Sequence, residues 1–295
     1  MNFLVIGQSV VDKIHDGNIL LVRPGGIFYT AVALKGFFEK GDKLFLCTTI
    51  DEMSYRLFSL VYDEVEREFI KNKERIPVVN LILKSSGERD EVYEYISENL
   101  EIDLKNLNRF SGILINMITG FDISIKQMQE IRKNYNGMIY FDVHTLSRAL
   151  IKNNKRVFRP VPDFFKWAKC IDILQANRHE LQTLSVKKNE REIVKDLLNF
   201  GIKQVIVTKA SDGAIAYFRK DGELKSINRK SFNTIAVNKV GCGDVFGAVY
   251  FYNYIRNKNV NEAILYANAA AGNSTRYLEV KDFLNIKNDV RKQLN

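Results

Sequence analysis

Cysteine and long apolar runs are scarce in this sequence, and each shortage argues against a class of protein. The three cysteines, Cys47, Cys170 and Cys242, lie far apart and form no Cys-x-x-Cys pair. This spacing argues against a disulfide framework or a zinc site and predicts a reducing compartment. Residues 1–7 carry no basic lead, and no apolar stretch is long enough to cross a bilayer. We therefore expect a cytoplasmic protein without a membrane partner.

Positive charge exceeds negative charge, but not in the pattern of a nucleic-acid reader. Lysine and arginine number 44 against 35 aspartates and glutamates, which gives a formal net charge of +9. The basic residues are scattered among acidic ones and are not interleaved with aromatic residues, so we expect no nucleic-acid partner. Hydrophobic residues make up 46% of the 295 residues, which is enough to bury a sizeable core.

Short apolar, β-branched runs alternate with amphipathic stretches along most of the chain. In one amphipathic stretch Ser124 is a predicted N-cap, and Ile125, Met128 and Ile131 share a helical face. This alternation predicts a mostly parallel sheet with helices on both faces. The expected buried strands are Phe3–Ile6, Leu44–Thr48, Ile113–Asn116, Met138–Val143, Ile171–Gln175 and Val205–Thr208.

Two segments interrupt the alternation and read as antiparallel strand pairs. Residues 14–23 turn at an Asp-Gly pair, and residues 77–96 turn at Ser86-Gly87. We expect them to form a small β layer beside the main sheet. A further hairpin, residues 214–230, is predicted to form the antiparallel edge of the main sheet.

Residues 241–244, Gly-Cys-Gly-Asp, form the most informative motif of the chain. The glycines on either side of Cys242 let backbone N–H groups converge at a helix start, where the helix dipole favours an anion. Asp244 would repel that anion unless it takes a proton from a hydroxyl that attacks a phosphate. The motif therefore predicts phosphoryl transfer to an alcohol, with Gly241, Cys242 and Gly243 receiving the anion. The alternative is a glycine-rich turn in which Asp244 only complements the helix dipole.

Asp12 follows the first predicted strand, at the end of the sheet where α/β proteins bind ligands. Its carboxylate can accept hydrogen bonds from two adjacent hydroxyls of a sugar or polyol. Gly25 and Gly26 lead into a helical stretch, residues 27–38, and let the backbone approach a ligand closely. These residues are therefore candidates for contact with a ligand, whereas the structural alternative for Asp12 is an Asx turn.

Taken in order, these motifs make the sequence similar to the ribokinase (PfkB) carbohydrate kinase family over nearly its whole length. Residues 238–244 resemble the signature Asp-Thr-x-Gly-Ala-Gly-Asp, with Asn and Lys239 at its first two positions. The Gly-Gly pair at 25 and 26 resembles Gly-Gly-x-x-x-Asn-x-Ala, with Thr30 in place of Asn. Residues 208–213 resemble Thr-x-Gly-x-x-Gly, with alanine at the first glycine.

The resemblance implies binding roles for further residues. Asn177 and Glu180 match an Asn-x-x-Glu motif whose glutamate organises Mg²⁺ through its water shell and whose asparagine lies near the nucleotide phosphates. A capping box is the structural alternative for this pair, and both readings can hold at once. The implied ATP-binding residues are Asn177, Thr208, Lys209, Gly213 and Asn268, and the implied acceptor-binding residues are Asp12, Gly25, Gly26 and Thr30.

The resemblance also implies a fold and an activity. The expected fold is ribokinase-like, a three-layer α/β/α arrangement of one domain over residues 1–295, with segments 14–23 and 77–96 forming a lid. The expected activity is transfer of the γ-phosphate of ATP, with Mg²⁺, to a hydroxyl of a sugar or polyol. A nucleoside kinase and a non-catalytic sugar or nucleotide sensor are the alternatives. Because a lid with an exposed strand edge can pair with a second copy, a homodimer is a further expectation. No role is assigned to Lys239 or His144.

Overall fold

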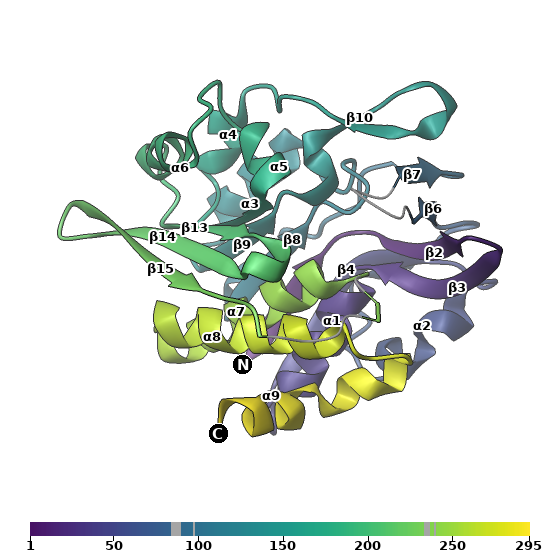
Figure 1. The fold of residues 1–295 in the computed structure, drawn as a ribbon. Helices are drawn as coiled ribbons and strands as arrows, with labels where there is room; N and C mark the ends of the chain where they lie inside the picture. Colours follow the sequence, from purple (N-terminus) through teal and green to yellow (C-terminus); the bar gives the residue numbers. More distant parts are fainter. Residues whose placement is uncertain (84–89, 97, 233–236, 239) are drawn as a thin grey trace.

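The computed structural model describes residues 1–83, 90–96, 98–232, 237–238 and 240–295. In this part of the chain a nine-stranded sheet runs in the order β15-β14-β13-β12-β9-β8-β1-β4-β5 (Figure 1). All neighbours from β13 to β5 pair in parallel, and β14 and β15 form the antiparallel edge predicted for residues 214–230. Its strands are β1 (Asn2–Ile6), β4 (Lys43–Ile50), β5 (Ile70–Asn72), β8 (Gly112–Asn116), β9 (Met138–Asp142), β12 (Ile173–Asn177), β13 (Gln204–Thr208), β14 (Ala214–Lys220) and β15 (Glu223–Arg229).

Helices cover both faces of this sheet because successive strand residues face opposite ways. In β1, Phe3 and Val5 belong to one buried cluster, whereas Leu4 and Ile6 belong to another. The first cluster includes side chains of α1 (Phe28–Phe37), α2 (Tyr55–Tyr62), α7 (Cys242–Asn257), α8 (Val260–Ser274) and α9 (Ile286–Leu294). The second includes side chains of α3 (Ile125–Asn134), α4 (Phe164–Ala168), α5 (Arg178–Gln182) and α6 (Glu190–Asn199). The predicted three-layer α/β/α fold is confirmed (Figure 1).

A second sheet stands at one end of the central sheet, in the order β3-β2-β6-β7 (Figure 1). Its strands are β2 (Ser9–Asp16), β3 (Ile19–Gly26), β6 (Val78–Ile82) and β7 (Asp90–Tyr93). The first hairpin is longer than predicted, because pairing continues as far as Ser9 opposite Gly26. Asp12 and Gly25 are consequently strand residues rather than loop residues. The turn predicted at Ser86-Gly87 lies outside the described residues.

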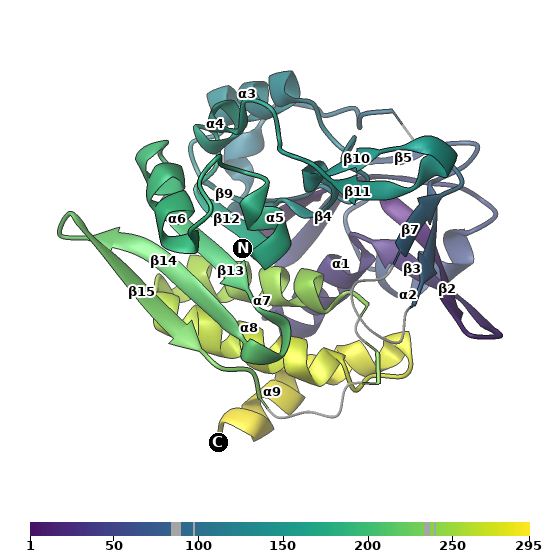
Figure 2. The same cartoon turned by 45° about the horizontal axis from the view of Figure 1, so that its top comes forward.

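A short hairpin of β10 (Arg148–Leu150) and β11 (Arg156–Phe158) was not predicted. It lies beside β7 (Figure 2), and Val92 of β7 forms a β-bridge with Lys155. Two ion pairs join the same elements, Arg148 with Glu91 at 2.6 Å and Lys155 with Asp90 at 3.0 Å. Three-residue strands of this kind carry too little periodicity to be read from sequence. Among the residues described, no helix is long and apolar enough to cross a bilayer.

Candidate active site

The site lies where the strand order reverses, at the carboxyl ends of β1 and β8. Open α/β sheets bind ligands at such a switch point. A cavity there lies between the second sheet and the start of α7. Its polar and aromatic lining residues are Asp12, Tyr29, Glu91, Tyr93, His144 and Asp244, and Gly26 and Gly241 also line it.

The glycine motif forms the helix start that its sequence predicts. Gly241 is the N-cap of α7 at φ +78°, and a Cβ there would lie 2.2 Å from Cγ of Tyr29, so only glycine fits. Asp244 is in the first turn of α7. A Cβ at Gly243 would meet only Nε2 of Gln175, at 3.9 Å, which is ordinary contact. Packing therefore does not require glycine at 243.

Asn116, the last residue of β8, forms a hydrogen bond with the candidate base, Asp244. Its Nδ2 donates hydrogen bonds to Oδ1 of Asp244 at 2.9 Å and to Oγ1 of Thr30 at 2.9 Å. The three residues come from three separate elements, β8, α7 and α1, and both Asn116 and Thr30 are buried. Thr30 thus lies next to the residue that orients Asp244. Sequence analysis missed Asn116, although a polar residue ending a buried strand was a signal for it.

Asp12 and the glycine pair meet across β2 and β3. A Cβ at Gly25 would lie 2.3 Å from Cγ of Asp12, so the glycine leaves room for this carboxylate at the cavity wall. Asp12 itself is only 5% exposed. Phe28 is fully buried in the core, whereas Tyr29 lines the cavity.

Two of the predicted ATP-binding residues, Asn177 and Thr208, are register partners at the carboxyl ends of β12 and β13. Asn177 caps α5, because its Oδ1 accepts hydrogen bonds from the N–H groups of His179 and Glu180, each at 2.9 Å. Oε2 of Glu180 in turn accepts from the N–H of Asn177 at 2.8 Å. The capping box is therefore confirmed, and it fixes Glu180 at the start of the helix.

The remaining predicted ATP-binding residues are Lys209 and Gly213, in the loop between β13 and β14, and Asn268 on α8. The N–H of Lys209 donates to the carbonyl of Gly213 at 2.7 Å, and Nζ of Lys209 pairs with Glu190 at 2.7 Å. Nδ2 of Asn268, on α8, donates to the carbonyl of Arg229 at 2.9 Å, next to β14. Lys239 lies outside the described residues.

Asp142 is a buried carboxylate whose charge interacts with the charges of Glu180 and Asp244. Burial, and then the charges of Glu180 and Asp244, raise the pKa of Asp142 well above its ordinary value. Nε2 of Gln175 donates to Oδ2 of Asp142 at 3.0 Å and to the carbonyl of Gly243 at 3.1 Å. A cation would relieve this crowding of negative charge. The described residues contain no group of three or more histidine, cysteine, aspartate or glutamate side chains that could hold a metal ion.

Comparison with known proteins agrees with this geometry. Residues 126–285 match the model of the pfkB family carbohydrate kinases, which is more than half of the 295 residues. A 5-dehydro-2-deoxygluconokinase of Clostridium beijerinckii is 24% identical over 215 residues, 71% of this chain and 51% of the relative. The chain thus spans about half the length of this curated relative.

Two solved structures share the fold along almost the whole chain. A ribokinase of Arabidopsis thaliana, complexed with ribose and ATP, has a TM-score of 0.73 at 17% identity, covering 98% of each chain. A pyrophosphate-dependent kinase in the ribokinase family, complexed with a pyrophosphate analog and myo-inositol, has a TM-score of 0.75 at 18% identity. That match covers 95% of this chain and 98% of the other. The fold, the order of the motifs and the family match lead to one conclusion: this chain belongs to the pfkB family of carbohydrate kinases.

Proposed function

We propose that this protein is a kinase that transfers a phosphoryl group to a hydroxyl of a sugar or polyol. One observation carries the proposal: Asp244, in the first turn of α7, and Asp12, on β2, line the same cavity. A binding protein needs no carboxylate beside an anion-binding helix start, whereas a kinase needs a base there. This argument favours a catalyst over a sugar or nucleotide sensor.

Each residue of the site has a task in this reaction. Asp12 accepts hydrogen bonds from hydroxyls of the acceptor and orients it, with Gly25 and Gly26 allowing close approach. Asp244 takes the proton of the attacking hydroxyl. The backbone N–H groups that start α7, at residues 241–243, stabilise the negative charge that develops during transfer. We further propose that the segments 14–23 and 77–96, which contribute to the second sheet, form a lid that excludes water from the site.

ATP with Mg²⁺ is the proposed donor. Asn177, Thr208, Lys209, Gly213 and Asn268 would hold the nucleotide beside the carboxyl ends of β12 and β13. Glu180 would hold Mg²⁺ through water, and the bound ion would offset the charge of the transferred phosphate. Support comes from the buried carboxylate Asp142, whose raised pKa reflects burial and negative neighbours that a cation would neutralise.

A panel assay tests this function. The purified protein is given ATP, GTP or pyrophosphate, with and without Mg²⁺, and a set of sugars, polyols and nucleosides, and phosphorylated products are measured. We expect Mg²⁺-dependent product from ATP with one sugar or polyol. Product from a nucleoside alone would instead establish the alternative acceptor. Tight binding of a sugar without product from any donor would establish the sensor.

We also propose a homodimer formed through the lid. β3 is the edge strand of the second sheet, and its residues 19–22, Ile-Leu-Leu-Val, are 40% to 59% exposed. Unpaired edges that carry apolar side chains favour pairing with another chain. Light scattering at increasing concentration should give twice the monomer mass of 34.0 kDa. Leu20→Lys should restore the monomer, and a parent that is monomeric at all concentrations would contradict the proposal.

A further inference from the structure

Gln175, on β12, is a buried amide beside the start of α7, and the proposed reaction gives it no task. It is 3% exposed. Its Oε1 accepts a hydrogen bond from the hydroxyl of Tyr140 at 2.5 Å, and its Nε2 donates to Oδ2 of Asp142 at 3.0 Å and to the carbonyl of Gly243 at 3.1 Å. Exchanging the amide oxygen and nitrogen would turn the oxygen toward the Gly243 carbonyl, where neither atom can donate. The contacts therefore define one orientation of this side chain.

The bond to Gly243 orients a whole peptide unit. The carbonyl of Gly243 and the N–H of Asp244 belong to the same planar unit, so the bond from Gln175 sets the direction of that N–H as well. The first hydrogen bond of α7, accepted by the carbonyl of its N-cap Gly241, comes from the N–H of Val245 at 2.9 Å. N–H groups that precede this bond point out of the helix start, toward the position that an anion takes. Gln175 thus orients one of the dipoles of the proposed phosphate site.

Position 247 of α7 leaves room for this amide. A Cβ at Gly247 would lie 2.9 Å from Oε1 of Gln175 and 3.2 Å from the hydroxyl oxygen of Tyr140. Glycine weakens a helix interior, and a buried amide has a desolvation cost that its hydrogen bonds must offset. An apolar side chain would also pack the helix on the sheet, since replacing a buried polar pair by apolar groups is often neutral for stability. Only a hydrogen-bond donor, however, fixes the direction of the Gly243 carbonyl.

We infer that Gln175 is a positioning residue for phosphoryl transfer, which orients the peptide unit of residues 243 and 244 toward the transferred group. The inference rests on the proposed kinase function and adds a residue that need not touch substrate. A dipole that already points at developing charge lowers the barrier, because no reorganisation is needed during the reaction. The same bond holds the first turn of α7, which carries the candidate base, against β12. Asp12 lies on β2 of the second sheet, so acceptor binding should not depend on Gln175.

A matched control lies on the neighbouring strand. Gln204, the first residue of β13, is 4% exposed, and its Oε1 accepts a hydrogen bond from the hydroxyl of Tyr250 at 2.7 Å. Tyr250 is also on α7, about two turns after Gly243, so both glutamines join the same helix to the same sheet. Gln204→Met and Gln175→Met each remove one buried amide from this interface. Only Gln175→Met releases the helix start.

The experiment combines steady-state kinetics on the acceptor that the panel assay identifies with hydrogen exchange of the ligand-free protein. In Gln175→Met we expect kcat to fall about 10- to 100-fold, with the acceptor KM within about twofold of the parent. Gln175→Glu keeps the shape but turns both donors into acceptors, so its loss of kcat should be at least as large. The amides of residues 243–247 should exchange about tenfold faster in Gln175→Met. Gln204→Met should keep kcat within about twofold of the parent and leave this exchange unchanged.

Three kinetic results would overturn the inference. One is a kcat in Gln175→Met within about threefold of the parent. Another is an equal loss of kcat in Gln175→Met and Gln204→Met, because packing rather than the direction of one peptide unit would then decide. If Gln175→Met does not fold, Tyr140→Phe takes its place. It leaves Oε1 of Gln175 without its donor and should lower kcat about threefold, so an unchanged kcat in that variant is the third.

Failure of the kinase proposal would be distinct from failure of this inference. A parent that forms no product with any acceptor would contradict the kinase, and hydrogen exchange would then decide alone. Faster exchange at residues 243–247 confined to Gln175→Met would support the positioning role. Equal exchange in the two methionine variants, Gln175→Met and Gln204→Met, would overturn it.

Discussion

Nδ2 of Asn116 donates a hydrogen bond to Oδ1 of Asp244 at 2.9 Å, and this bond fixes the direction of the candidate base. The second proton of the same amide goes to Oγ1 of Thr30. Rotating the amide would turn its oxygen toward a carboxylate, so the two bonds define one orientation. Because the pair joins β8 to α7, the base is held by the sheet rather than by its own helix alone.

We predict that Asn116 positions the base and that Asn116→Ala lowers kcat about 10- to 100-fold with a small change in acceptor KM. A carboxylate that loses a donor is protonated more easily, so the acid limb of the pH–rate profile should move to higher pH. Asn253→Ala is the control, because Asn253 is a buried amide on α7 that bonds only the carbonyl of Val249 among the described contacts. It should lower stability without moving the profile. An unmoved profile in Asn116→Ala would contradict the positioning role.

The two glycines of the motif should respond differently to alanine. Gly241→Ala forces a side chain into φ +78° and against the Tyr29 ring, so we expect a loss of about 2 to 4 kcal/mol of stability. Gly243→Ala has room and a helical backbone, so its melting temperature should stay or rise slightly. Its kcat should nevertheless fall at least about tenfold, because the methyl group obstructs the start of α7. Full activity of Gly243→Ala would show that no ligand approaches there.

Asp142→Asn should stabilise the ligand-free protein. The folded protein holds the pKa of Asp142 above its unfolded value of about 3.9, so the carboxyl costs stability as pH rises through that value. The amide keeps an acceptor for Gln175 and removes the charge. We expect a melting temperature about 2 to 4 °C higher at pH 7 in EDTA, with no gain near pH 3. Mg²⁺ with ATP should narrow this gap, and a gap independent of pH would contradict the electrostatic explanation.

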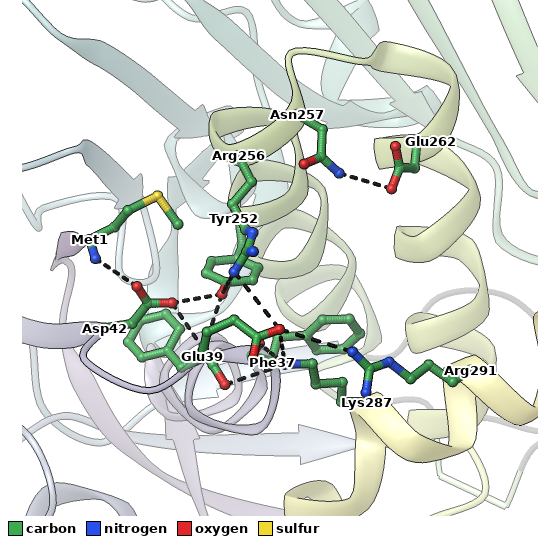
Figure 3. A network of polar contacts seen from close by, with 11 residues as sticks. Met1, Phe37, Glu39, Asp42, Tyr252, Arg256, Asn257, Glu262, Lys287 and Arg291 are labelled. Carbon is green, nitrogen blue, oxygen red and sulfur yellow. Dashed lines mark hydrogen bonds and ion pairs between the residues drawn. The ribbon is translucent and has the colours of Figure 1, made fainter.

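A polar network joins the N-terminus, α7 and α9 (Figure 3). Burial raises the pKa of Asp42, but hydrogen bonds from the N-terminal ammonium, the Tyr252 hydroxyl and the N–H of Glu39 outweigh it and leave the pKa below its ordinary value. The stability from Asp42 is therefore present at neutral pH and is lost as pH falls below about 4. Asp42→Asn should cost about 1 kcal/mol at pH 7, after screening by solvent, and nothing at pH 2.

The control for this prediction lies in the same region. Glu262 accepts a hydrogen bond from Asn257 at the exposed end of α7 (Figure 3). Glu262→Gln should change stability by less than about 0.5 kcal/mol at either pH. Equal losses in Asp42→Asn at pH 7 and pH 2 would show that shape rather than charge makes the network stabilising.

Local patterns predicted the central sheet because its strands are buried on both faces. The runs that contain Leu4, Ile113 and Val205 are apolar without alternation, and glycine and capping signals separate them. The cap at Ser124 is present, with its side chain accepting from the N–H of Gln127. The strand that ends at Asn177, β12, was predicted two residues too early in the sequence. Ile171 and Asp172 precede it and are buried too, so burial alone does not mark where the strand begins.

Contacts between distant segments were beyond the reach of these patterns. Asn116 meets Asp244 across 128 residues of sequence, and Glu91 meets Arg148 through a hairpin too short to show periodicity. Asp12 was expected in a loop because its strand, β2, follows β1 after only two residues. Motif spacing therefore predicted Asp12, Gly26, Gly241 and Asp244, which line the cavity, whereas the residues that orient them depend on packing.

The most direct test of the account is the turnover of Asp244→Asn on the acceptor that the panel identifies. The amide keeps the shape of the side chain and cannot take the proton of the attacking hydroxyl. We predict that kcat falls by about 10² to 10⁴ while ATP affinity and melting temperature stay close to those of the parent. A variant that folds, binds ATP and turns over its acceptor at nearly the parental kcat would contradict the assignment of Asp244 as the base.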